Sequence, residues 1–130
     1  MNKLMIVLAS ALALTVSASM AQAGPCTAKD QAALAKALTN KGHFSGTWKK
    51  GNFDGPFDMK FSMNGGKLVI KVNASNQHGR RTGWHTMGRT TISGNKVNFV
   101  SKQNGVIRLT IRSNCSISGR QPGGTTLSLR

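Results

Sequence analysis

The chain has 130 residues, of which 18 are lysine or arginine and only three are acidic, so its formal net charge at neutral pH is +15. The three acids are all aspartates, 15 residues are glycine, and hydrophobic residues make up 38% of the chain. This composition predicts one small domain, leaves little material for the paired carboxylates of acid–base catalysis, and argues against a helical bundle.

The first 23 residues have the three parts of a secretory signal peptide. Lys3 is followed by an apolar stretch, residues 4–16, and then by small residues that end in Ala21-Gln22-Ala23, the order that a signal peptidase recognises. We expect cleavage after Ala23, which leaves 24–130 as a single β-rich domain with a net charge of 17 − 3 = +14. A transit peptide or an uncleaved anchor is the alternative, and an arginine-free leader that ends in A-x-A argues against both.

The apolar stretch is shorter than the ~20 residues of a membrane span. We therefore expect a soluble, exported protein of a bacterial periplasm or the extracellular space, with no integral membrane segment after signal cleavage.

The two cysteines, Cys26 and Cys115, are expected to form a disulfide, because an even number of cysteines in an exported protein is typical of bridges. Lipidation of Cys26 is a minor alternative that the rigid Pro25 before it disfavours. A metal site is a weaker one, since the three histidines have no metal-ligand spacing with each other or with either cysteine. No cofactor is expected.

A short helix is predicted over about 28–40. Thr27-Ala28-Lys29-Asp30 has the form of a capping box, an alanine-rich run follows it, and Asn40-Lys41-Gly42 supplies the stop. Leu34 and Leu38 lie four residues apart and give the helix a single apolar seam for packing.

From His43 onward, hydrophobic residues recur at every second position, which is the period of a β-strand. The clearest strand is 57–63, in which four apolar residues are expected to point inward together: Phe57, Met59, Phe61 and Met63. Asn64-Gly65-Gly66 then offers the positive φ angles of a tight hairpin. The same alternation predicts further strands at 43–48, 68–72, 84–92, 97–99, 107–117 and 127–129, with 107–117 running on through a bend.

These strands number about seven to eight. Antiparallel strands joined by short turns bury a core only as a closed or nearly closed sheet, or as a two-layer sandwich. We therefore expect a mainly β fold: a single small antiparallel β-barrel or barrel-like sandwich over about 43–129, with one short N-terminal α-helix and with the barrel form favoured.

Several strand positions that face outward on this pattern are basic: Lys60, Lys67, Lys71, Arg89, Lys96, Arg108 and Arg112. Their neighbours are Ser, Thr and Asn instead of acids, so the surface repels itself. A single-sign field of this kind is typical of proteins that hold a polyanion.

The densest basic segment is the loop His78-Gly79-Arg80-Arg81-Thr82-Gly83, which leads into Trp84-His85. Adjacent guanidinium groups bind phosphate or sulfate, and an indole stacks on a base or a sugar. The alternative is a solvated loop with Trp84 at the rim of the core. The residues we expect to bind are Arg80, Arg81, Trp84, His85, Lys67, Lys71, Arg108 and Arg112.

A second basic segment is Trp48-Lys49-Lys50. Trp48 is more readily a core residue, because on a strand it points to the same face as Phe44. Gly46-Thr47-Trp48 resembles the G-x-W opening of lipocalin and avidin-like barrels. The resemblance covers three residues, and it implies that Trp48 closes one end of a barrel whose interior holds a small ligand.

The leading hypothesis for function is a non-enzymatic binding protein for an anionic polymer or surface, such as nucleic acid, acidic polysaccharide or lipopolysaccharide phosphate. A small-ligand barrel is the second hypothesis, and an inhibitor of an acidic protein target is another. Disruption of membranes by the helix is disfavoured, because the segment lacks basic amphipathic character.

The enzyme class that the residues permit most easily is a metal-free ribonuclease with His43 and His85 as acid and base. A Ser-His-Asp triad lacks the G-x-S-x-G turn that would support its nucleophile. No catalytic residue is therefore assigned.

Overall fold

The computed structural model describes residues 24–27 and 30–130. The expected signal peptide, 1–23, and the first two residues of the expected helix lie outside this part. The structure has one described helix, α2 (Gln31–Lys41), and nine strands. They are β1 (His43–Lys50), β2 (Phe53–Asn64), β3 (Lys67–Ala74), β4 (His85–Thr86), β5 (Gly88–Ser93), β6 (Lys96–Ser101), β7 (Gly105–Ile111), β8 (Ile117–Arg120) and β9 (Thr126–Leu129).

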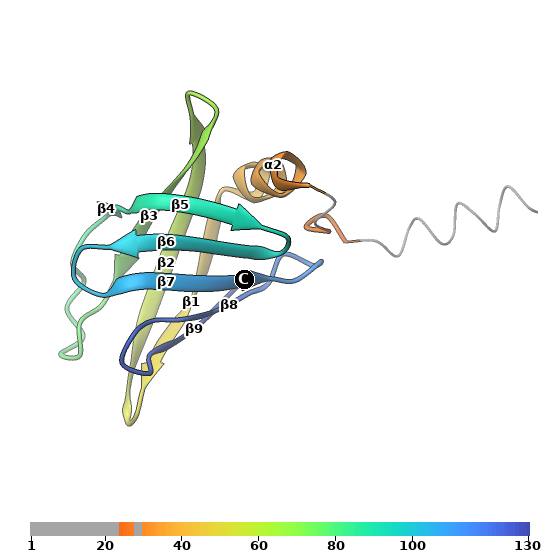
Figure 1. Ribbon diagram of the computed structural model, residues 1–130. Coiled ribbons are helices and arrows are strands. Elements are labelled where there is room, and N and C mark those ends of the chain that lie inside the picture. The colour runs from red at the N-terminus through yellow and green to blue at the C-terminus, as the bar shows by residue number, and fades with distance from the viewer. Residues whose placement is uncertain (1–23, 28–29) are drawn as a thin grey trace, which may run out of the picture.

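All nine strands belong to one antiparallel sheet in the order β4-β3-β2-β1-β9-β8-β7-β6-β5. The two strands at the ends of this order, β4 and β5, are consecutive in the chain and are separated by Met87 alone. One run of chain therefore pairs with β3 through β4 and with β6 through β5, so the sheet curls into a nearly closed barrel (Figure 1). The expected barrel class is confirmed.

The strand count is nine instead of seven to eight, because two expected strands, 84–92 and 107–117, are each broken in two. The break in 84–92 lies at Met87. The backbone N–H of Met87 still donates to the Ile70 carbonyl of β3 at 2.8 Å. Beyond it the chain turns toward β6, and the register of β5 shifts between Gly88 and Thr91. This break is where one strand changes partners, and it leaves the seam between β3 and β5 open.

The side chains that alternate inward fill the barrel. The aromatic rings of Phe44 and Phe61 meet edge to face with centroids 5.2 Å apart, and α2 covers one end with Leu34 and Leu38 fully buried. Met63, expected to face inward, is instead 44% exposed, because the β2–β3 hairpin runs past the end of the barrel (Figure 1).

The helix begins later than expected, and its cap is Asp30. The Asp30 side chain accepts a hydrogen bond from the Ala33 backbone N–H at 2.7 Å. The hydroxyl of Thr27, the expected first residue of the capping box, donates to the Gly24 carbonyl. A shorter helix with an Asp cap therefore replaces the expected one.

The expected disulfide between Cys26 and Cys115 is present, and it closes a sequence separation of 89 residues. A loop of that length contributes up to about 4 to 5 kcal/mol in the chain-entropy description. The Cys26 backbone N–H also donates to the Ser113 carbonyl at 2.9 Å. The segment before the helix is thus tied to the turn between β7 and β8.

That turn corrects another expectation, since 107–117 is not one bent strand. β7 ends at Ile111 and β8 begins at Ile117. Between them the Asn114 side chain accepts a hydrogen bond from the Ser116 N–H at 3.0 Å, and Cys115 has a positive φ of 70°. An Asx-type turn was available in the sequence at Asn114, and alternation alone does not reveal it.

The turns alternate between the two ends of the barrel, which we call the helix end and the loop end. The loop end holds the β1–β2, β6–β7 and β8–β9 turns and the 75–84 loop. A Cβ placed on Gly105 would lie 3.3 Å from Cγ of Pro122, and one on Gly123 would lie 3.5 Å from Nζ of Lys50. Three of these turns therefore touch.

Gly46 is required where β1 meets β9. A Cβ at this position would lie 1.8 Å from the backbone oxygen of Ser128, so we expect Gly46→Ala to force the two strands apart and to lower the free energy of unfolding by about 3 kcal/mol or more. Urea denaturation measures this loss. Gly88→Ala is the matched control, because its added methyl meets ordinary contacts of 3.4 Å or more. Equal losses of unfolding free energy in the two variants would contradict the claim that the close approach of β9 requires a glycine at position 46.

Candidate polyanion-binding surface

The outer wall of the barrel carries cations that no acid balances. Every outward lysine and arginine expected from the strand pattern is exposed. Two cross-strand pairs place like charges directly opposite each other, Lys60 against Lys71 and Arg108 against Arg120. Such pairs of like charges destabilise a sheet.

The second pair lies on a groove of about 650 Å³ on the wall formed by β6, β7, β8 and β9. Its cations are Lys96, Arg108 and Arg120, and no acidic residue lines it. Hydroxyl and amide groups stand between them: Asn98, Thr110, Ser118 and Thr126. The groove therefore offers charged and neutral hydrogen-bond donors to one ligand.

The two arginines belong to a longer row of register partners. In order from β5 to β2, this row reads Thr91, Asn98, Arg108, Arg120, Thr126, Lys49 and Asp54. Neighbouring strands lie about 4.8 Å apart, so successive members are spaced for contacts along an extended chain. Asp54 closes the row at its far end.

The structure separates the two arginines of the 78–83 loop. The Arg81 side chain donates to a carboxylate oxygen of Asp58, and its backbone forms an isolated bridge with Ser75. Arg80 is exposed, and its backbone N–H donates to the Asn76 side chain at 3.0 Å. Arg81 is therefore partly neutralised within the fold, and the two guanidinium groups do not form one binding fork.

Asp58 is the centre of a polar cluster on the wall of β1 and β2. Ser45 Oγ donates to its Oδ1 at 2.7 Å, and His43 Nε2 lies 3.2 Å from the same oxygen. Partial burial raises the pKa of Asp58, but the hydrogen bonds from Ser45, Arg81 and His43 together outweigh it and lower the pKa below its ordinary value of 3.8. The carboxylate stays ionised and holds the loop to the wall.

Trp84 lies beside this cluster with 40% of its surface exposed, on the outside of the barrel and not at the rim of the core. Lys60 Nζ sits 4.1 Å from the centroid of its ring, and the His43 ring meets it at 5.8 Å edge to face. The indole is thus exposed as expected, but the ammonium group of Lys60 already covers one of its faces. Trp48 is buried, and its Nε1 donates to Ser75 Oγ at 3.1 Å.

The other expected binding residues are dispersed. Lys71 faces the same wall as Lys60, whereas Lys67 begins β3 at the tip of the β2–β3 hairpin. Arg112 lies in the β7–β8 turn, where its Nη1 donates to Ser116 Oγ at 3.3 Å. The His85 ring nitrogen Nε2 pairs with the Thr82 carbonyl at 2.8 Å. Of the eight expected residues, only Arg108 lines the groove.

Arg120 lines the groove but is not among the expected binding residues, because the expected strand ends at 117 and Gly119-Arg120 lies beyond it. Both residues belong to β8. The alternation of Ile117 and Gly119 with Ser118 and Arg120 carried the signal. The alternation is hard to recognise there, because Gly119 lies shortly before the turn that contains Pro122-Gly123.

The histidines considered for catalysis make other contacts: His43 lies beside Asp58, and His85 pairs with the Thr82 carbonyl. Ser45 donates to Asp58 and not to His43, so the three do not form the relay of a nucleophilic triad. Within residues 24–27 and 30–130, no group of three or more His, Cys, Asp or Glu side chains is placed to hold a metal ion. In the same part of the chain, no helix has the length and apolar character needed to cross a membrane.

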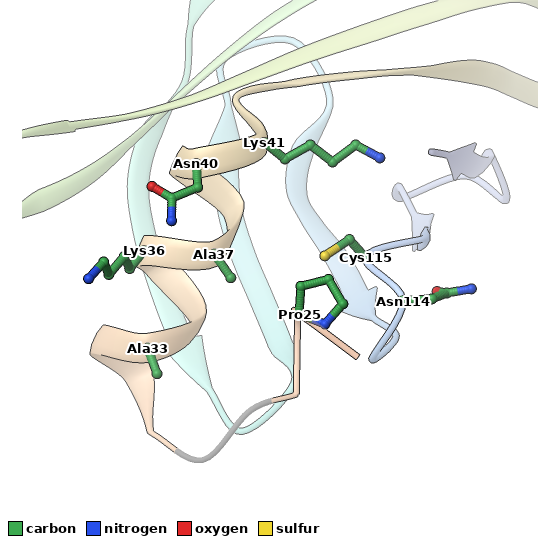
Figure 2. A pocket seen from close by; sticks show the side chains of 8 residues that line it. All are labelled: Pro25, Ala33, Lys36, Ala37, Asn40, Lys41, Asn114 and Cys115. Carbon is green, nitrogen blue, oxygen red and sulfur yellow. The ribbon is translucent and has the colours of Figure 1, made fainter. Parts of the chain in front are cut away.

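A second hollow, of about 580 Å³, lies between α2 and the disulfide. Ala33, Ala37, Pro25 and Cys115 give it apolar walls (Figure 2). Its two lysines, Lys36 and Lys41, leave the helix in different directions, so they do not converge on one anion. The β6–β9 groove is the better candidate for an anionic ligand.

The Asp58 cluster makes a pH-dependent prediction. We expect Asp58→Asn to lower the free energy of unfolding by about 1 kcal/mol at neutral pH, because Arg81 and Ser45 lose a charged partner. The folded-state pKa lies below the ordinary 3.8, so this stabilisation is present above that pH and is lost as the pH falls through the folded-state value.

Urea denaturation at neutral pH and near pH 3 measures the difference between the variant and the natural protein. Exposed Asp54 supplies the matched control, Asp54→Asn, for which a smaller loss is expected. A loss for Asp58→Asn that does not shrink in acid would show that the carboxylate charge is not what stabilises the cluster.

Comparisons of the chain with protein-family models, with curated proteins and with solved structures find no match.

Proposed function

We propose that this is an exported, non-enzymatic binding protein that holds an anionic polymer along the β6–β9 groove. The observation that carries the proposal is the direct pairing of Arg108 with Arg120 across β7 and β8. No acid lines the groove around them. The repulsion between the two side chains is relieved when an anionic group lies between them.

The chemistry of the groove suits phosphate, sulfate or carboxylate groups. Guanidinium groups bind such anions through paired, charge-assisted hydrogen bonds. Lys96 adds a third charge, although its Nζ also donates to Thr110 Oγ1 at 2.8 Å. Release of counterions from the polymer would supply much of the affinity, as it does for other polyanion-binding proteins.

Nucleic acid, acidic polysaccharide and lipopolysaccharide phosphate share this chemistry. No aromatic residue lines the groove, so stacking of bases there contributes nothing. Single-stranded DNA, heparin and lipopolysaccharide are the three probes that distinguish the sources, compared at equal salt concentration.

The buried side chains favour the outer wall over the interior as the binding site. Residues such as Phe99, Ile107 and Leu129 are fully buried inside the barrel, and both hollows described above lie outside it. The observed packing gives the small-ligand hypothesis no added support.

We expect the double variant Arg108→Gln/Arg120→Gln to weaken binding to heparin and single-stranded DNA by 10-fold or more at about 0.1 M salt, and to reduce the slope of log affinity against log salt by about 1.5. The matched control is Lys36→Gln/Lys41→Gln on α2, which removes the same charge away from the groove. Fluorescence anisotropy over a salt series measures both.

Equal losses in the two double variants would show that a diffuse field binds the polymer, and the groove would then not be the site. Cleavage of single-stranded RNA by the natural protein in chelator, lost in His85→Ala, would instead support the ribonuclease hypothesis.

A further inference from the structure

The tip of the β1–β2 hairpin exposes an aromatic residue that the sequence analysis did not single out. Phe53 is 54% exposed, the most exposed of the large hydrophobic side chains at the described surface. Its direct cross-strand partner is Lys50, and the next pair is Lys49 with Asp54. A large apolar ring and one lysine therefore lie opposite each other where the two strands meet a two-residue turn, and alternation places Lys49 on the other face, opposite Asp54.

This hairpin extends beyond its neighbours at the loop end of the barrel (Figure 1). The same end of the barrel also carries Arg80, in the 75–84 loop, and Lys102, in the β6–β7 turn. Both are exposed. Asp54 is the one acid among these turns and this loop. The loop end is thus a cationic surface with a protruding aromatic tip.

More than half of Phe53 is exposed, and exposed phenyl surface is unfavourable in water. An aromatic side chain with a lysine beside it matches the boundary between the lipid headgroups and the acyl chains. Each lysine near an anionic membrane surface adds further attraction. A protein partner would more often be met by several clustered apolar anchors, whereas this tip has one ring.

We propose that the loop end docks on an anionic lipid bilayer, with Phe53 entering the headgroup boundary and Lys50 contacting lipid phosphates. This activity goes beyond the proposed function, because it uses other residues and another partner than the β6–β9 groove. The groove lies on the side wall, so a docked molecule would still present it to a polymer.

The β2–β3 hairpin at the opposite end supplies a matched control. Met63 is also exposed, and the next residue, Asn64, pairs with Lys67 at that tip. The comparison is between Phe53→Ser/Lys50→Gln and Met63→Ser/Lys67→Gln. The two variants remove the same charge and a large apolar side chain from similar hairpins. Both altered pairs are exposed, and circular dichroism confirms that each variant folds.

Co-sedimentation with vesicles of phosphatidylcholine and phosphatidylglycerol measures docking, and vesicles of phosphatidylcholine alone measure the dependence on charge. We expect the natural protein to prefer the anionic vesicles. Phe53→Ser/Lys50→Gln should reduce that binding by about 10-fold or more, whereas Met63→Ser/Lys67→Gln should change it by less than about threefold.

Equal losses in the two hairpin variants, or binding of the natural protein to neither vesicle, would overturn the proposal. Arg108→Gln/Arg120→Gln separates it from the proposed function, since that variant should lose heparin binding and keep vesicle binding. If Phe53→Ser/Lys50→Gln lost heparin binding and kept vesicle binding, the tip would belong to the polymer site instead.

Discussion

The pairing of the last strand with the first is the interaction on which the rest of the structure depends. β9 lies between β1 and β8, and it joins the meander of the N-terminal strands to that of the C-terminal strands. The backbones approach so closely at Gly46 that no side chain fits. With the sheet curled in this way, and with α2 and the disulfide covering one end, the apolar side chains fill the interior. The two described hollows lie on the outside of the barrel.

On that outside, the same sheet registers that build the barrel also place the charges. Arg108 lies opposite Arg120, and Lys60 lies opposite Lys71. On each strand the neighbouring residues face the core, so these basic residues face outward. The β1–β2 wall and the β6–β9 wall then differ in whether an acidic residue pairs with the cations. Asp58 binds Arg81 and His43 on the β1–β2 wall, while the β6–β9 groove has no acid. The cations of the groove therefore remain available, which is why we assign the polymer to it.

The barrel class, the disulfide and the outward lysines and arginines were predictable from the sequence, because they follow from alternation and from the number of cysteines. The turn at Asn114 had a local signal in the asparagine, which alternation alone does not reveal. The break at Met87 was not predictable, since it depends on which strand lies next to which. For the same reason the Arg80-Arg81 segment was a poor guide to the site. Adjacency in sequence does not show that Asp58, 23 residues before Arg81, takes one of the pair. Arg120 became significant only through its register with Arg108.

The most direct test is to map the amide chemical shifts of the isotope-labelled protein during titration with heparin and with single-stranded DNA. The account predicts that the largest changes fall on outward positions of β6 to β9, with Asn98, Arg108 and Arg120 foremost. The proposed binding site would be contradicted if the largest changes fell on the segment from His78 to His85. Changes spread evenly over all exposed lysines and arginines would contradict it as well.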